Sequence, residues 1–338
     1  MKAAVFAFSR QGCQTAHRVY SFLSAGECRA YAAPRLCEPG FSPIMQPSGP
    51  FYAGQFRWAD ALVFVGACGI AVRAIAPHVK DKRTDPAVVC IDEQGRFVIP
   101  LLSGHIGGAN RLAQELALKL GAQAVITTAT DLNGRFSVDT WAAQQGYLID
   151  SMEKAKAVSA AILERDIPLC SDLPLAELPP GVFAGEQGSL GISVGWSVRD
   201  PFEVTLHIIP RVLHIGIGCR RGTPARTISG AVDQVCAQNG IDTRAVKGIS
   251  SIDLKSDESG LLDCCREHRW PLTFYSAQEL ESVQGSFSAS AFVQSVTGVD
   301  NVCERAALAR ADRLLVRKTA IDGVTVAVAA ENQEVRFG

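Results

Sequence analysis

A hydroxyl, an imidazole and a carboxamide stand within eight residues of one another at Ser103, His105 and Asn110. Three glycines share this segment and let the main chain approach a ligand closely: Gly104, Gly107 and Gly108. An unperturbed imidazole titrates near neutrality, so the side chain of His105 can accept or donate a proton. By themselves, the glycines are compatible with a tight turn that has no further role. A histidine among such small residues favours a site of proton transfer.

A second polar segment, Thr127 to Asp131, follows about twenty residues later. Asp131 is a candidate to orient the imidazole of His105 or to hold a water molecule. A Ser-His-Asp triad with Ser103 as nucleophile is conceivable, but the GxSxG elbow is missing, which favours water activated by His105. Thr128 and Thr127 can either touch a ligand or satisfy the main chain where a strand ends.

Basic residues provide candidate partners for anions. Arg73, Lys82 and Arg83, together with Lys80, are candidates to bind carboxylates, although a single exposed cation is commonly only solvated. His78 follows a proline at an expected helix end and is compatible with a simple C-terminal cap.

A second glycine-rich turn, GIGCRRGT, covers residues 216–223. Two arginines in such a turn, before a helix N-terminus, are compatible with an anion site. Two solvated side chains on an ordinary turn explain the pattern equally well. The candidate ligand-binding residues there are Gly218, Cys219, Arg220, Gly222 and Thr223, and Thr223 is also the expected N-cap of the helix. Neither turn matches a P-loop or a dinucleotide fingerprint, so a nucleotide site is unsupported.

The elements around the first turn form a βαβ pattern. The apolar run 97–102 predicts a strand of parallel type covered on both faces, and residues 88–91 are expected to pair with it across a turn at 92–95. An apolar stripe predicts a helix over 109–120 that ends at Gly121, followed by a strand at 124–126. This arrangement places both polar turns at the carboxyl edge of the sheet, where open α/β folds bind ligands.

The whole chain is predicted to be α/β, with two βαβ-type domains, mainly parallel sheets, and a small α+β insert between them. The expected domains are 1–135, which contains the SGHIGGAN loop, the central segment 136–210, and 211–338, which contains the GIGCRRGT loop. Residues 34–50 hold five prolines and are expected to form a loop.

Composition excludes several classes of protein. The net charge of −1 argues against general binding of nucleic acid or of an anionic membrane. No apolar run is long enough to span a membrane, and a cytoplasmic location is expected. The eleven cysteines lack metal-ligand spacing, so we predict buried thiols and no metal site in the protein.

Five segments in this order carry a resemblance to a known family: GACGIAVRAIAP (66–77), KDKRTDPAVVCIDEQG (80–95), LLSGHIGGAN (101–110), VITTATD (125–131) and GIGCRRGT (216–223). The chain resembles the cobalt-precorrin-5A hydrolases of anaerobic cobalamin biosynthesis. The resemblance is dense from 60 to 140, clear from 211 to 330, and weak from about 145 to 210. Pro100, where a small polar residue is expected, is a small departure that leaves the SGH motif intact.

The resemblance implies a hydrolase that opens the δ-lactone of a ring-contracted cobalt tetrapyrrole and releases acetaldehyde to give cobalt-precorrin-5B. The cobalt would arrive with the substrate, so no cofactor is expected, and transient contact with other enzymes of the pathway is conceivable. Such chemistry needs a base, oxyanion donors and cations for the carboxylates of the macrocycle. A non-catalytic tetrapyrrole carrier and a nucleotide-dependent enzyme remain alternatives.

Overall fold

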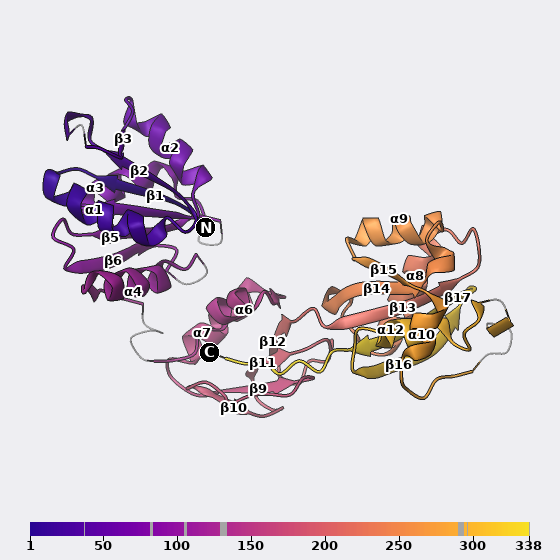
Figure 1. The fold of residues 1–338 in the computed structure, drawn as a ribbon. Coiled ribbons are helices and arrows are strands. Elements are labelled where there is room, and N and C mark those ends of the chain that lie inside the picture. Colours follow the sequence, from indigo (N-terminus) through magenta and orange to yellow (C-terminus); the bar gives the residue numbers. More distant parts are fainter. Residues whose placement is uncertain are drawn as a thin grey trace. The chain divides into compact units, whose positions relative to one another are not determined.

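A computed structural model describes residues 1–337 except 37, 82–83, 105–106, 129–133, 290–293 and 296. The chain divides into two compact units, 1–144 and 145–338 (Figure 1). The described residues contain three sheets, of seven, five and five strands, in which parallel pairs predominate. The predicted α/β class with mainly parallel sheets is therefore confirmed. The predicted domain boundaries at 135 and 210 stay predictions.

The first unit is built on a seven-stranded sheet with helices on both faces (Figure 1). Its strands, in spatial order, are β3 (Ser42–Pro43), β2 (Glu27–Ala32), β1 (Lys2–Ala7), β4 (Ala61–Val65), β5 (Ala87–Ile91), β6 (Phe97–Leu102) and β7 (Gln123–Ala124). Strands β4 and β5 are buried along their whole length, as their unbroken apolar sequences require.

One face of this sheet is covered by α1 (Arg10–Leu23) and α4 (Ala109–Leu120), and the other by α2 (Ser48–Trp58) and α3 (Cys68–Ile75). Helix α4 buries the apolar stripe that its sequence predicts and ends at Gly121, whose φ of 69° is the left-handed conformation expected of a C-terminal glycine. Strand β3 and the start of α2 lie within the segment 34–50 that we expected to be a loop, so that expectation is wrong over residues 42–43 and 48–50.

The direction of β6 decides where the SGHIGG turn lies. Strand β6 is antiparallel to β5 and parallel to β7, with the predicted hairpin turn between β5 and β6. Ser103 follows the carboxyl end of β6, as predicted, but it lies at the edge of the sheet where β1, β4 and β5 begin. The prediction that this turn lies at the carboxyl edge of the sheet is therefore wrong. Most of β6 is only partly buried, so the prediction of a parallel-type strand covered on both faces was wrong.

The second unit contains two five-stranded sheets. The first has the order β10 (Val182–Ala184), β9 (Ile167–Ser171), β11 (Leu190–Val194), β12 (Val204–Ile209) and β8 (Leu148–Ile149), and α7 (Met152–Ala161) packs on it. The second has the order β15 (Leu272–Tyr275), β14 (Val246–Ile252), β13 (Leu213–Cys219), β17 (Val324–Ala330) and β16 (Arg313–Ile321). Helices α8 (Ala225–Gln238), α9 (Ser259–His268), α10 (Ala277–Ser282) and α12 (Val302–Leu308) accompany the second sheet.

The segment after β17 bonds to the segment that follows β9. The amide N–H of Val335 donates to the carbonyl of Pro174 at 2.8 Å, and the amide of Ala176 donates to the carbonyl of Val335 at 3.0 Å. The side chain of Val335 is fully buried. Residues 331–337 therefore form a strap from the end of β17 to the segment that follows β9.

The described cysteines and helices bear on two expectations from the sequence, namely buried thiols and the lack of a membrane-spanning segment. Ten cysteines of the described residues carry free thiols, and seven of these are buried. None of the described helices is both long and apolar enough to cross a membrane.

Candidate functional site

The loop after β6 is held in place by its own main chain. The carbonyl of Ser103 accepts the amide of Ala109, and the carbonyl of Gly104 accepts the amide of Asn110, both at 3.0 Å. Ser103 has a φ of 57°, an uncommon conformation for a residue with a side chain. Its buried hydroxyl donates to the main-chain carbonyl of Asp85 at 3.0 Å, which ties the loop to the start of β5.

Each glycine of the loop meets a specific demand. A methyl group on Gly104 would lie 2.7 Å from Oδ1 of Asn110, and one on Gly107 would overlap the side chain of Ser103. Gly108 is the N-cap of α4 with a φ of 80°. Side chains at Gly104 and Gly107 would therefore clash with their neighbours. The side-chain amide of Asn110 donates to the hydroxyl of Thr128 at 2.8 Å.

The structure brings together part of the predicted site. Six predicted residues belong to this loop or bond to it: Ser103, Gly104, Gly107, Gly108, Asn110 and Thr128. Thr127 is exposed beside Thr128. His105, Asp131, Lys82 and Arg83 lie outside the described residues, and their roles stay predictions.

Asp85 is a site residue that sequence reasoning missed. Its carboxylate Oδ2 accepts the amide N–H groups of Lys80 and Asp81 at 2.8 and 3.0 Å, and only 7% of the residue is exposed. Its carbonyl receives the hydroxyl of Ser103. One residue thus fixes both the segment that begins at Lys80 and the loop after β6. The only signal in the sequence was an aspartate directly before Pro86 at a strand start.

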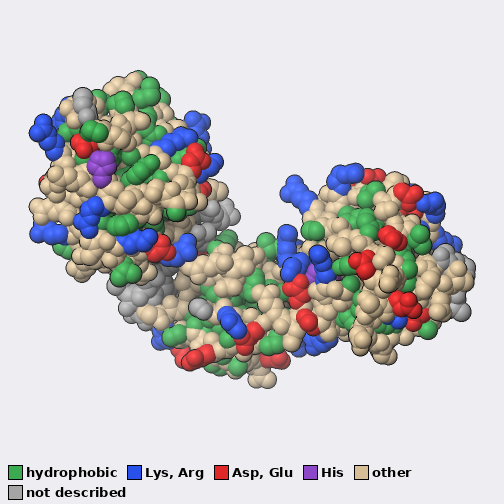
Figure 2. Space-filling view, in the orientation of Figure 1, with side chains coloured by type: hydrophobic (Ala, Val, Ile, Leu, Met, Phe, Trp, Pro, Cys, Tyr) green, Lys and Arg blue, Asp and Glu red, His purple; other side chains and the backbone are tan. Residues whose placement is uncertain are grey.

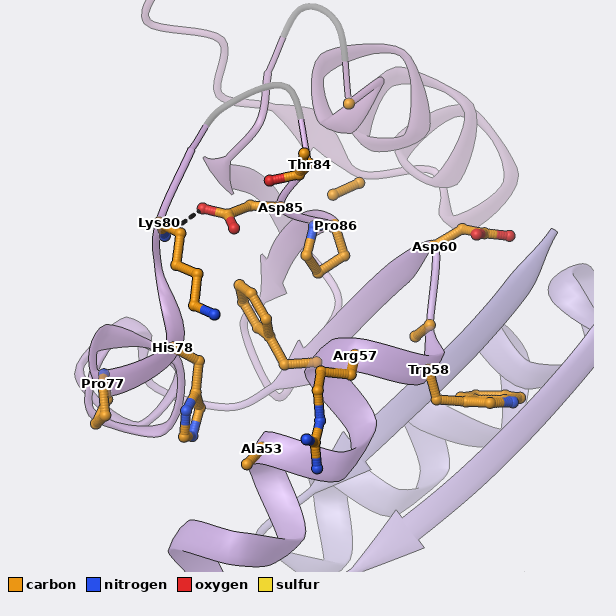
Figure 3. Close-up of a pocket in the computed structure, with 14 residues that line it drawn as sticks. Ala53, Arg57, Trp58, Asp60, Pro77, His78, Lys80, Thr84, Asp85 and Pro86 are labelled. Atoms are coloured by element: carbon orange, nitrogen blue, oxygen red, sulfur yellow. Dashed lines mark hydrogen bonds between the residues drawn. The ribbon is translucent and has the colours of Figure 1, made fainter. Parts of the chain in front are cut away.

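A cavity of about 660 Å³ opens beside the loop, and Gly107 borders it (Figure 3). Its walls come from the end of α2, the residues after α3, and the starts of β4 and β5. Figure 3 shows Lys80 and His78 on one side and Arg57 on the opposite side, with the side chain of Asp85 nearby. The volume falls in the range of small-molecule sites.

A second hollow of about 290 Å³ shares Pro77 and His78 with the first cavity. Tyr52, Ile70 and Arg73 also line it. The predicted carboxylate-binding residue Arg73 therefore lies in this second hollow, where its guanidinium makes only a long contact of 3.4 Å with the carbonyl of Gly69.

The second glycine-rich turn, in the other unit, is filled by its own chain. The amide N–H of Gly222 donates to the buried carboxylate of Glu258 at 2.7 Å, and Arg221 pairs with Asp257 at 2.6 Å. The turn follows the carboxyl end of β13, as predicted. Protein carboxylates therefore occupy part of the anion site that we predicted for this turn.

Among the other predicted residues of this turn, Thr223 is not the N-cap of α8. Its hydroxyl donates to the carbonyl of Arg220 at 2.7 Å, and Pro224 takes the N-cap position with no side-chain bond. That expectation was wrong because the short hydroxyl side chain closes the turn behind it instead. Gly218 lies against Thr325, and the hydroxyl of Thr325 donates to the main-chain carbonyl of Gly218 at 3.2 Å. Cys219 is partly exposed.

Charged side chains of both signs are interspersed over the face shown in Figure 2, without an extended basic region. This agrees with the net charge of −1 and makes any anion recognition local. Anion recognition would therefore depend on the cationic side chains that line the two hollows, and not on a general surface charge.

Comparisons with known proteins concern most of the chain. The family "Cobalamin synthesis G N-terminal" matches residues 51–131, which include every residue that lines the 660 Å³ cavity, and "Cobalamin synthesis G C-terminus" matches residues 213–329. Cobalt-precorrin-5A hydrolase of Salmonella typhimurium is 34% identical over 342 residues, which covers 96% of each chain. The Priestia megaterium protein of that name is 35% identical, with 81% of this chain and 79% of its own covered.

Proposed function

Because this chain belongs to the cobalt-precorrin-5A hydrolase family, we propose that it opens the δ-lactone of cobalt-precorrin-5A with water and releases acetaldehyde to give cobalt-precorrin-5B. The observation in the structure that carries the proposal is the cavity bordered by Gly107, because it adjoins the loop that contains the best candidate base. Its lining supplies cations for a substrate edged with carboxylates.

The first step is attack of water on the lactone carbonyl. His105 takes a proton from the water, and the carbon–oxygen bond of the lactone breaks to give a carboxylate on the macrocycle and a free hydroxyl on the two-carbon arm. Main-chain N–H groups of the glycine-rich loop are the candidate donors for the oxyanion. Ser103 is less suited to act as nucleophile, because its hydroxyl already donates to the carbonyl of Asp85.

The second step is loss of the two-carbon arm. A base removes the proton of the new hydroxyl, the C–O bond becomes the carbonyl of acetaldehyde, and the bond between the ring and the arm breaks. The electron pair of that bond passes into the conjugated macrocycle. We assign this proton transfer to His105 as well, with Asp131 in an orienting role.

The other candidate residues from the sequence analysis are assigned to substrate binding or to support of the loop. Arg73, Lys82 and Arg83 are assigned to the peripheral carboxylates, and Asn110 and Thr128 to the support of the loop. The turn from Gly218 to Thr223 is a weaker candidate, because Glu258 already binds the amide of Gly222.

The test is release of acetaldehyde from cobalt-precorrin-5A, followed by coupled oxidation of NADH with alcohol dehydrogenase. We expect His105→Ala to reduce turnover by about 10²–10⁴-fold while substrate binding persists, and Asp131→Asn to reduce it less. Wild-type protein that binds the substrate but releases no acetaldehyde would be a carrier. Wild-type activity in His105→Ala would remove His105 from the mechanism.

We further propose that the enzyme works in the cytoplasm, where free thiols persist, because the described cysteines are unpaired. No cofactor of its own is needed, since the cobalt belongs to the substrate. Transient contact with neighbouring enzymes of cobalamin biosynthesis would protect the intermediate, and nucleic acid is not a partner.

A further inference from the structure

Three nitrogen-bearing side chains converge on the 660 Å³ cavity from different elements. Arg57 comes from the last turn of α2, His78 from the short helix after α3, and Lys80 from the segment beyond it (Figure 3). Among the described residues, neither Arg57 nor Lys80 forms an ion pair with a carboxylate. Their positive charges are therefore not neutralised by the protein side chains that the structure describes.

The carboxylates of the same cavity are bound elsewhere. Asp85 receives the main-chain N–H groups of Lys80 and Asp81, and Asp60 receives the main-chain N–H of Lys2 at 2.7 Å. Both acids therefore stabilise the main chain and do not pair with the cationic side chains. The side chains of Arg57 and Lys80 therefore remain available to pair with a bound anion.

His78 adds a polar atom without a partner. Its Nε2 is buried and forms no hydrogen bond within the described structure, while its ring packs 6.0 Å from the ring of Phe56, centroid to centroid. A buried polar atom without a partner costs free energy, and in native proteins it commonly marks a place where a ligand or water completes the bonding. His78 also borders the second hollow, which holds Arg73.

We propose that the two hollows form one recognition site for the acetate and propionate side chains of the macrocycle, with Arg57, Lys80 and His78 around the larger hollow and Arg73 in the smaller one. This inference rests on the proposed function and names the part of the chain that holds the substrate. An arginine can bind a carboxylate with two parallel N–H donors, and a lysine acts as a point charge. Apolar side chains between these cations, Phe56, Tyr52 and Ile70, would contact the ring itself.

The experiment compares two stable corrinoids that differ in the charge of their edge. Cobyrinic acid carries free carboxylates, and cobinamide carries amides on the same ring. Visible absorbance titrations measure the Kd of each for the full-length protein. We expect wild type to bind cobyrinic acid at least 100-fold more tightly than cobinamide. Equal affinity for the two compounds would overturn the proposal.

Variants of the three side chains assign the residues. Arg57→Gln, Lys80→Gln and His78→Gln should each weaken cobyrinic acid binding by about tenfold, the loss expected of one charge-assisted hydrogen bond, and leave cobinamide binding unchanged. The matched control is Arg111→Gln, because Arg111 is an exposed arginine of the same unit that lies outside both hollows. Wild-type affinity for cobyrinic acid in all three variants would overturn the proposal, as would displacement of cobyrinic acid by millimolar inorganic phosphate, which would indicate a phosphate site.

Turnover separates this inference from the proposed function. With cobalt-precorrin-5A as substrate, the three variants should raise KM by about tenfold and change kcat by less than about twofold, because they remove uniform binding. A wild type that distinguishes the two corrinoids but releases no acetaldehyde would refute the proposed reaction and support the binding site. Normal turnover with unchanged KM in the variants would refute the binding site alone.

Discussion

Asp85 should control the local stability of the candidate site. Its carboxylate accepts two main-chain N–H groups, from Lys80 and Asp81, at 2.8 and 3.0 Å. A hydrogen bond to a charged group contributes about 1.5–3 kcal/mol and a neutral one about 0.5–1.5 kcal/mol. Asp85→Asn can keep both bonds in neutral form, so we expect this variant to lose about 2–3 kcal/mol of local stability.

Hydrogen exchange measures this loss directly. A local destabilisation of 2–3 kcal/mol corresponds to about 30–140-fold faster exchange of the amides of Lys80 and Asp81, because 1.4 kcal/mol is a factor of ten. Mass spectrometry of peptides that cover residues 77–90 would report it on the full chain. Acetaldehyde release should fall as well, since Lys80 and the loop at Ser103 lose their common support.

Asp60→Asn is the matched control for Asp85→Asn. Asp60 lines the same cavity but is exposed and accepts a single N–H, from Lys2. Its replacement should leave exchange at 77–90 unchanged. Unaltered exchange of the Lys80 and Asp81 amides in Asp85→Asn would refute the reasoning, because it would mean that the charge on the carboxylate contributes nothing to those two bonds.

Three further changes test other parts of the molecule. Glu304→Gln should cost about 3–5 kcal/mol in urea unfolding, because the fully buried carboxylate accepts main-chain N–H groups on both oxygens and an amide must turn its NH₂ toward one of them. Burial would raise the pKa of Glu331, but hydrogen bonds from Lys247 and His214 outweigh burial and lower that pKa. Thermal stability should therefore fall on acidification below the ordinary glutamate range, and Glu331→Gln should flatten this loss. Val335→Ala should cost about 2 kcal/mol, measured as a lower Tm.

The sequence predicts many elements because their signals are local. Strand β6 has the predicted bounds, since it is an apolar run set off by turn residues. By contrast, β9 was not predicted, because Pro168 stands within it and weakens the strand signal.

The site was harder to predict because it is assembled from distant segments. Helix α2 supplies Arg57, yet Gly49, Pro50 and Gly54 give it low helix propensity, and it is stabilised by packing of Phe56 on the sheet. The reversal of β6 brings Ser103 and Gly107 to the starts of β4 and β5, and this depends on strand pairing that a local pattern does not encode. The apparent anion site at Gly222 could not be judged without knowing that Glu258 lies there.

The strap at residues 331–337 has a consequence for how the protein is made. Val335 pairs with Leu175, which is translated 160 residues earlier. At about 5–20 residues per second, residues 145–338 take roughly 10–40 s to emerge. During that time the backbone of residues 174–176 has no partner from the strap, so chaperones and proteases can reach this side of the nascent unit until Val335 arrives and closes it.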